Sequence, residues 1–144
     1  MRIFCDTSVL VAASVQSLDH HARARPVLER VIKGSDEGVI GLHSVAEVYA
    51  TLTRLPVTPR IQPNEATLIL QNNILGHFKV QALSQGDYGE VIEEASAKGF
   101  IGGAIYDALL LACAEKAKVS RIYTFNLSDF RRIAPHLGDL ITAP

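Results

Sequence analysis

The sequence has no tryptophan, one methionine and only two cysteines among its 144 residues. Cys5 and Cys113 both lie in apolar segments, so we expect buried, reduced thiols in a cytoplasmic protein and no disulfide framework. No cysteine and histidine residues have the spacing of a zinc site. These absences exclude a small domain that depends on disulfides or zinc for its stability.

Long apolar runs and an excess of basic charge are also missing. No run approaches the ~18 residues that span a bilayer, and Met1-Arg2 leads directly into the first apolar segment. We therefore expect neither membrane attachment nor a signal peptide. The formal net charge is -1, whereas a protein that simply coats nucleic acid would be basic. This balance argues against a plain nucleic-acid-binding module, but it allows an enzyme whose acidic residues gather at one site.

The composition is that of a globular α/β protein, with 48% hydrophobic and 20% charged residues. Short apolar segments alternate with helical patterns, which favours a central parallel sheet of about four or five strands flanked by helices. The length predicts a single domain over residues 1–144. The expected strands are Ile3–Cys5, Val39–Leu42, Val80–Leu83, Arg121–Phe125 and Leu140–Thr142. The expected helices include Val9–Val15, His20–Lys33, Pro63–Leu75, Asp87–Lys98 and Ala104–Ala114.

Acidic residues stand where these strands and helices are expected to meet. Asp6 follows the first strand, Asn126 and Asp129 follow the fourth, and Glu47 and Asp107 lie near helix starts. The carboxyl ends of parallel strands and the starts of the following helices share one edge of a sheet, so these side chains should converge. Converging carboxylates need a cation to be stable near neutral pH. All-oxygen ligands favour Mg²⁺ or Mn²⁺, and such ions promote phosphodiester hydrolysis.

Each acid also has a purely structural interpretation. Asp6, Asp107 and Asp129 could cap the helices that follow them, and Glu47 with Ser44 fits the capping-box pattern. This alternative requires four unrelated helix caps that happen to share one order and spacing.

Four short motifs carry these acids: Asp6-Thr7-Ser8, Ser44-Val45-Ala46-Glu47, Tyr106-Asp107-Ala108 and Thr124-Phe125-Asn126-Leu127-Ser128-Asp129-Phe130. Their order and separation, over essentially the whole chain, resemble the PIN domain family. The compact length is similar to that of the VapC-type toxin ribonucleases of prokaryotic toxin–antitoxin pairs. The resemblance implies a PIN-like three-layer α/β fold and a metal-dependent endoribonuclease. It also implies a homodimer that is inhibited by a cognate antitoxin, whose peptide lies across the active-site groove.

Carried onto this chain, the resemblance makes Asp6, Glu47 and Asp107 the three core metal ligands. Many relatives have Asp where this chain has Asn126, and others have Asn there with an Asp three residues later, as at Asp129. Asp129 could therefore supply the fourth charge, with Asn126 as a neutral ligand or hydrogen-bond donor. The family's small hydroxyl positions near the metal are matched by Thr7, Ser8 and Thr124.

Weaker patterns complete the set of candidates. Arg131 and Arg132 could hold RNA phosphates near Asp129, although solvated charges are the default interpretation. Tyr106 is expected in the core, and the five histidines are expected on the surface or in loops.

Two other classes of protein share part of this pattern. An aspartyl-phosphate phosphatase also has an Asp at the end of its first strand, but it would have a second Asp at the position of Ser8. The non-enzymatic alternative is a PIN-like scaffold that only binds RNA or a partner protein. Metal binding would discriminate between such a scaffold and the nuclease.

Overall fold

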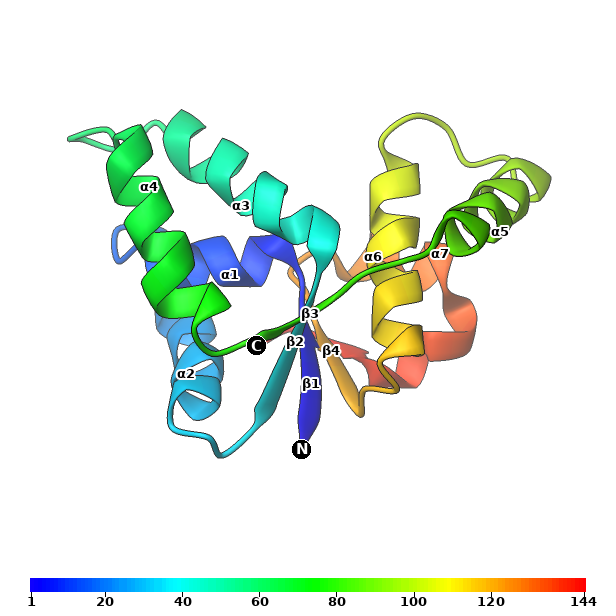
Figure 1. The fold of residues 1–144 in the computed structure, drawn as a ribbon, viewed down its shortest axis with the longest axis horizontal. Helices are drawn as coiled ribbons and strands as arrows, with labels where there is room; N and C mark the ends of the chain where they lie inside the picture. Colours follow the sequence, from blue (N-terminus) through cyan, green and yellow to red (C-terminus); the bar gives the residue numbers. More distant parts are fainter.

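Five parallel strands form one sheet in a computed structural model that describes residues 1–144 (Figure 1). Their order across the sheet is β3-β2-β1-β4-β5, and every neighbouring pair is parallel. The α/β class predicted from the sequence is confirmed. The strands are β1 (Arg2–Cys5), β2 (Glu37–Gly41), β3 (Lys79–Gln81), β4 (Arg121–Tyr123) and β5 (Ile141–Thr142).

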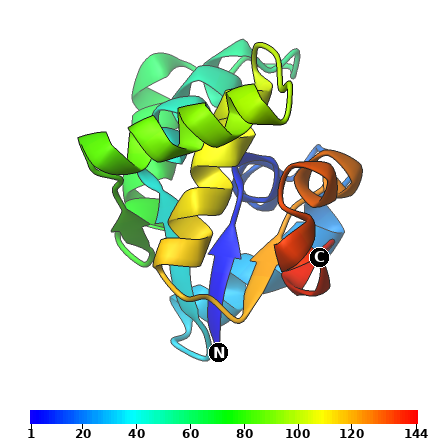
Figure 2. The same ribbon diagram turned by 90° about the vertical axis from the view of Figure 1, so that its right-hand side faces the viewer.

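Helices cover both faces of the sheet and give the molecule three layers (Figures 1 and 2). One layer consists of α1 (Thr7–Ser14), α2 (His21–Ile32), α3 (Leu42–Arg54), α4 (Pro63–Ile69) and the π-helical segment η1 (Leu70–Leu75). The other consists of α5 (Gln85–Ala97), α6 (Ala104–Lys116), α7 (Leu127–Ile133) and the 3₁₀ segment η2 (Pro135–Leu140). None of these helices has the length and apolarity that crossing a membrane would require.

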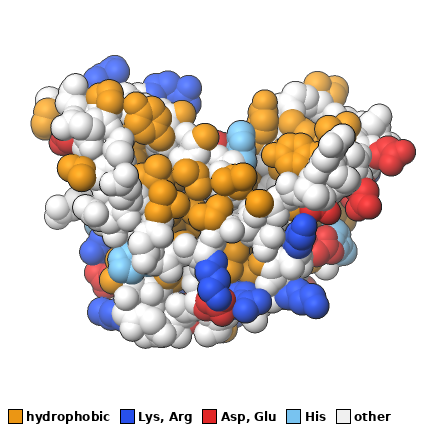
Figure 3. All heavy atoms as spheres, in the orientation of Figure 1, with side chains coloured by type: hydrophobic (Ala, Val, Ile, Leu, Met, Phe, Trp, Pro, Cys, Tyr) orange, Lys and Arg blue, Asp and Glu red, His pale blue; other side chains and the backbone are white.

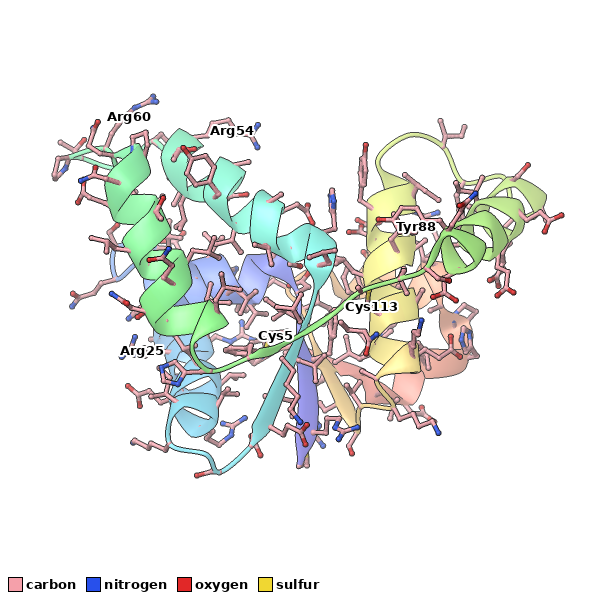
Figure 4. The ribbon with its side chains drawn as sticks, viewed as in Figure 1. Cys5, Arg25, Arg54, Arg60, Tyr88 and Cys113 are labelled. Carbon is pink, nitrogen blue, oxygen red and sulfur yellow. The ribbon has the colours of Figure 1, made fainter.

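The central strand β1 is buried on both faces. Ile3 and Cys5 belong to the hydrophobic core under α1–α4, and Phe4 belongs to the core under α6 and α7. This alternation follows from the two-residue period of a strand. Cys5 and Cys113 are both buried and unpaired, as predicted (Figure 4). Because β1 is fixed by two cores, the residue that follows it, Asp6, has a well-defined position at the sheet edge.

The predicted capping box at Ser44 and Glu47 is wrong. Helix α3 begins at Leu42 with Gly41 as its N-cap, so neither residue occupies the position that the pattern assigned to it. Strand β2 runs directly into α3 at this point. A Cβ atom on Gly41 would lie 2.6 Å from Cδ2 of Leu110 in α6, which shows how closely α6 approaches the β2–α3 junction.

Candidate active site

Asp6 is a buried carboxylate, 3% exposed, with both oxygens held by hydrogen bonds. The Ser8 hydroxyl donates to Oδ1 at 2.6 Å, and the Thr124 hydroxyl donates to Oδ2 at 2.7 Å. The Val9 N–H also donates to Oδ1, at 3.2 Å, which makes Asp6 the N-cap of α1. Burial raises the pKa of Asp6, and these hydrogen bonds partly oppose the rise. The capping interpretation is therefore correct, but a cap alone would not require the bond from Thr124.

The register of the sheet brings Thr124 to Asp6. In the pairing of β1 with β4, Cys5 lies opposite Tyr123, so the next residues of the two strands are neighbours. The Asp6 N–H donates to the Tyr123 carbonyl at 3.1 Å and continues the pairing by one step. Thr124 is fully buried, and its Oγ1 accepts the Asn126 N–H at 2.9 Å. Thr124 thus connects the carboxylate to the loop that leads into α7.

Glu47 reaches the site from α3, opposite the start of α1. The Thr7 hydroxyl lies 3.1 Å from the Ser44 hydroxyl and 3.3 Å from Oε1 of Glu47. His43, one turn earlier in α3, places Nε2 3.7 Å from the same oxygen. Ser44 is completely buried. These contacts place the Glu47 carboxylate beside Thr7, the residue that follows Asp6.

Asp107 and Asp129 occupy the first turns of α6 and α7, where the helix dipole favours negative charge. The pKa of Asp107 is nevertheless raised to about 6, chiefly by burial and then by the negative charges of Asp6, Glu47 and Asp129. The charge of Arg132 opposes this rise. Exposed charges act on one another only over about 10 Å at ordinary ionic strength. Asp107 therefore lies within electrostatic reach of each of the other three acids selected from the sequence.

The chemistry of this site fits a hard divalent cation. Its donor atoms are carboxylate, hydroxyl and amide oxygens, which Mg²⁺ and Mn²⁺ prefer. A bound cation would offset the repulsion that raises the pKa of Asp107. No three acidic, histidine or cysteine side chains are close enough to hold an ion in their present rotamers.

A surface hollow opens beside these acids, between α1, α3 and the residues that follow β4. Asn126 lines it together with Thr7, Ser8 and Glu47. Asp129, by contrast, has a 59% exposed side chain and influences Asp107 from α7. The two candidates for the fourth position thus approach the site from different sides. The remaining wall residues are Val11, Ala12, Leu18, Asp19, His20, Thr51 and Phe125.

The two predicted phosphate-binding arginines have different surroundings. Arg132 places Nη2 3.8 Å from Oδ1 of Asp129, at the rim of the acidic site. Arg131 donates from Nη2 to the Ile141 carbonyl at 2.9 Å. It lines a separate polar hollow with Asp139. Of the pair, Arg132 is the one whose charge acts on the acids.

An aromatic pair at the site was missed by the sequence analysis. The rings of His43 and Tyr106 are stacked, with centroids 4.7 Å apart and an angle of 4° between their planes. Tyr106 was predicted to lie in the core, but it is 48% exposed. The first turn of α6 extends beyond the sheet, so Tyr106 packs on His43 of α3 instead. Figure 3 shows the notch between the two helix layers at this edge of the molecule.

Comparison with known proteins yields relatives over most of the chain. A family model described as "PIN domain" matches residues 3–135. Ribonuclease VapC27 of Mycobacterium tuberculosis (strain ATCC 25618 / H37Rv) is 32% identical over 111 residues, which cover 76% of this chain and 75% of the relative. Ribonuclease VapC40 of the same strain is 31% identical over 112 residues, which cover 78% of each chain.

Solved structures share the fold over nearly the full length. VapBC2 from Rickettsia felis, bound to a DNA fragment from its promoter, superimposes with a TM-score of 0.70 and 22% identity, covering 100% of this chain and 99% of that one. VapC20 of Mycobacterium tuberculosis, described as a Sarcin-Ricin loop cleaving toxin, superimposes with a TM-score of 0.68 and 17% identity. The match covers 88% of this chain and 92% of that one. FitAcB from Neisseria gonorrhoeae superimposes with a TM-score of 0.65 and 18% identity, covering 99% of this chain and 96% of that one.

Proposed function

Because the chain belongs to the PIN domain family and is related to the VapC ribonucleases, we propose that it is a metal-dependent endoribonuclease. It would hydrolyse RNA phosphodiester bonds as the toxin of a toxin–antitoxin pair. The observation that carries this proposal is the approach of acids on α3, α6 and α7 to Asp6 at the end of β1, which together with burial raises the pKa of Asp107 to about 6. The ribonuclease names of the relatives support RNA as the substrate.

The proposed roles follow from the contacts of each side chain. Asp6, Glu47 and Asp107 would ligate Mg²⁺ or Mn²⁺, and Asp129 or Asn126 would complete the site. The bound ion would lower the pKa of a water molecule and stabilise charge on the phosphate. Hydrogen bonds from Ser8 and Thr124 orient the Asp6 carboxylate. Thr7 is the hydrogen-bond partner of Glu47, and no protein nucleophile is needed.

We also propose two protein partners, a cognate antitoxin and a second copy of this chain. The pairing of VapC-type toxins with antitoxins supports the first. Exposed hydrophobic side chains support a protein interface, because contiguous apolar surface on a monomer commonly marks one. Figure 3 shows such side chains across the face that carries β3. The chain's exposed large hydrophobic residues include Leu42, Leu68, Leu75, Val80 and Ile92.

A toxin that cleaves cellular RNA would act in the cytoplasm.

Replacing Asp6 tests the catalytic proposal directly. Asp6→Asn removes the charge but keeps a good helix cap, which Asp6→Ala would lose as well. We expect RNA cleavage in Mg²⁺ to fall at least about 100-fold, since a metal ligand is lost. The measurement is single-turnover cleavage of a labelled single-stranded RNA.

The matched control is Asp139→Asn. Asp139 is an exposed acid in η2 that forms no ion pair, so its replacement makes the same chemical change outside the site. We expect the control to cleave like the wild type. Equal cleavage by Asp6→Asn and Asp139→Asn would contradict the proposed active site and favour a non-catalytic scaffold.

A further inference from the structure

The hollow beside Glu47 has a wall that the proposed hydrolysis does not use. His20 lies in the connection between α1 and α2, and Phe125 lies just after β4. Their rings are stacked, with centroids 4.2 Å apart and an angle of 12° between their planes. Both residues line the hollow that Ser8 and Glu47 also line. Two segments far apart in sequence thus place a flat aromatic surface next to the acids.

The two rings differ in their exposure. Phe125 is half-buried and packs against the core under α1–α4, whereas His20 is exposed. Since one face of the His20 ring rests on Phe125, the opposite face is the one left open. Phe125 therefore acts as a rigid support that holds the imidazole plane in place.

Positive charge accompanies this aromatic pair. Arg23, in the first turn of α2, places its guanidinium carbon 5.5 Å from the centre of the Phe125 ring. Its Nε donates to the Pro144 carbonyl at 3.1 Å, which fixes the side chain. A cation within about 6 Å of a ring is attracted to its face. Arg23 therefore packs against Phe125 and helps to hold that ring in place.

Polar groups in the hollow suit the edge of a nucleobase. The Asn126 amide both donates and accepts, the Asp19 carboxylate accepts, and the Thr51 hydroxyl does either. Single-stranded RNA is commonly recognised by stacking an unpaired base on an aromatic side chain and by hydrogen bonds to the base edge. Such stacking accepts any base, because every base has a π-face. The hollow combines both means of recognition beside the acidic site.

We propose that this hollow is a nucleobase subsite, in which the base of a nucleotide adjacent to the cleaved phosphate stacks on the open face of His20. The inference rests on the proposed ribonuclease function, which supplies the RNA. The subsite would lie next to Asp6, because Ser8 lines the hollow and the Ser8 hydroxyl also donates to the Asp6 carboxylate. The subsite would contribute substrate affinity and base preference, and it would not take part in the chemical step.

The first test compares KM with kcat for variants of His20. His20→Leu keeps the bulk of the side chain but removes the ring, and it should raise KM for a short RNA about tenfold with kcat within about twofold. His20→Tyr restores an aromatic plane and should return KM close to the wild-type value. Tyr88→Leu is the matched control, because Tyr88 is a 41% exposed aromatic residue on α5 in the other helix layer, and KM should not change (Figure 4).

The second test needs no cleavage. A short RNA that carries one 2-aminopurine base is titrated with protein in EDTA, because the fluorescence of this base is quenched when it stacks. We expect quenching by the wild type, His20→Tyr and Tyr88→Leu, and a loss of most of it in His20→Leu. Unchanged KM together with unchanged quenching in His20→Leu would overturn the subsite. Quenching that depends on His20 in a protein that never cleaves RNA would keep the subsite and refute the proposed nuclease.

Discussion

Asp6 carries both structural and chemical constraints at the residue scale. Its Oδ1 caps α1 through the Val9 N–H, and its Oδ2 is held by the hydroxyl of Thr124. A buried carboxylate is costly unless its oxygens are hydrogen-bonded or paired with a cation. The surrounding hydroxyl groups therefore make it possible to place a charge at the end of a central strand, where a divalent ion would bind.

Replacement of Thr124 should show how much the fold depends on this arrangement. Thr124→Val removes the donor to Asp6 and leaves the Asn126 N–H without its acceptor. We expect the free energy of unfolding to fall by about 1–3 kcal/mol, the usual cost of a buried polar group that loses its partner. Urea unfolding of the metal-free protein measures the change. Thr124→Ser keeps the hydroxyl and should recover most of the stability, whereas equal losses in the two variants would contradict the role of the hydroxyl.

The charge of Asp107 should destabilise the metal-free protein. Its pKa is about 6 in the folded state, above its ordinary value of 3.8. The folded state therefore binds more protons between these values, and the wild type loses stability as the pH rises through this range. Asp107→Asn removes the charge, so its advantage in melting temperature should appear between pH 4 and 6 and stay constant above pH 6.

Thermal melting in EDTA from pH 4 to pH 8 checks this expectation. Asp139→Asn serves again as the control and should follow the wild type across the range. If Asp107→Asn melts below the wild type at pH 7.5, the ionised Asp107 carboxylate does not destabilise the metal-free protein.

At the scale of elements, the junction of β2 with α3 determines where Glu47 lies. Gly41 has an ordinary backbone conformation, with φ of -77°, which any residue could adopt. Glycine is needed at this position because there is no space for a side chain. An added Cβ would lie 2.6 Å from Cδ2 of Leu110, which is only 2% exposed. The glycine therefore allows the start of α3 to lie close to the middle of α6, and these two helices carry Glu47 and Asp107.

Gly41→Ala should push the start of α3 away from α6. We expect a loss of about 1–3 kcal/mol in the free energy of unfolding, as for other overpacked cores, and a loss of RNA cleavage, because Glu47 moves relative to Asp107. Gly89→Ala is the matched control, since a Cβ there meets no atom within 4 Å and the change should slightly stabilise α5. Full cleavage by a stably folded Gly41→Ala protein would show that the spacing of the two helices is not critical.

The elements also show which parts of the structure are predictable from sequence. Strand β1 and the position of Asp6 follow from local apolar patterns, and the sheet edge that gathers the acids follows from the parallel topology. The start of α3 at Leu42 does not, because its N-cap is Gly41, which makes no side-chain capping hydrogen bond that a sequence pattern would reveal. The exposure of Tyr106 on α6 was mispredicted because its neighbour His43 belongs to α3, which is far away in the sequence.

At the scale of the whole molecule, two helix layers flank a single sheet, with a notch between them at one edge (Figures 1 and 3). Glu47 comes from the layer of α1–α4, Asp107 and Asp129 come from the layer of α5–α7, and Asp6 lies at the end of the strand between them. A cation bound by Asp6, Glu47 and Asp107 would connect both layers. We therefore expect RNA cleavage to require a divalent ion that these three acids hold jointly.

A titration with Mn²⁺ tests this claim most directly. Metal binding, followed by calorimetry, and cleavage of a labelled RNA are measured in the same buffer for the wild type, Asp6→Asn and Asp139→Asn. We expect the binding and cleavage curves to coincide for the wild type and for Asp139→Asn, and both to be lost in Asp6→Asn. Cleavage that proceeds in EDTA, or Mn²⁺ binding that survives unchanged in Asp6→Asn, would contradict a metal site built on these acids.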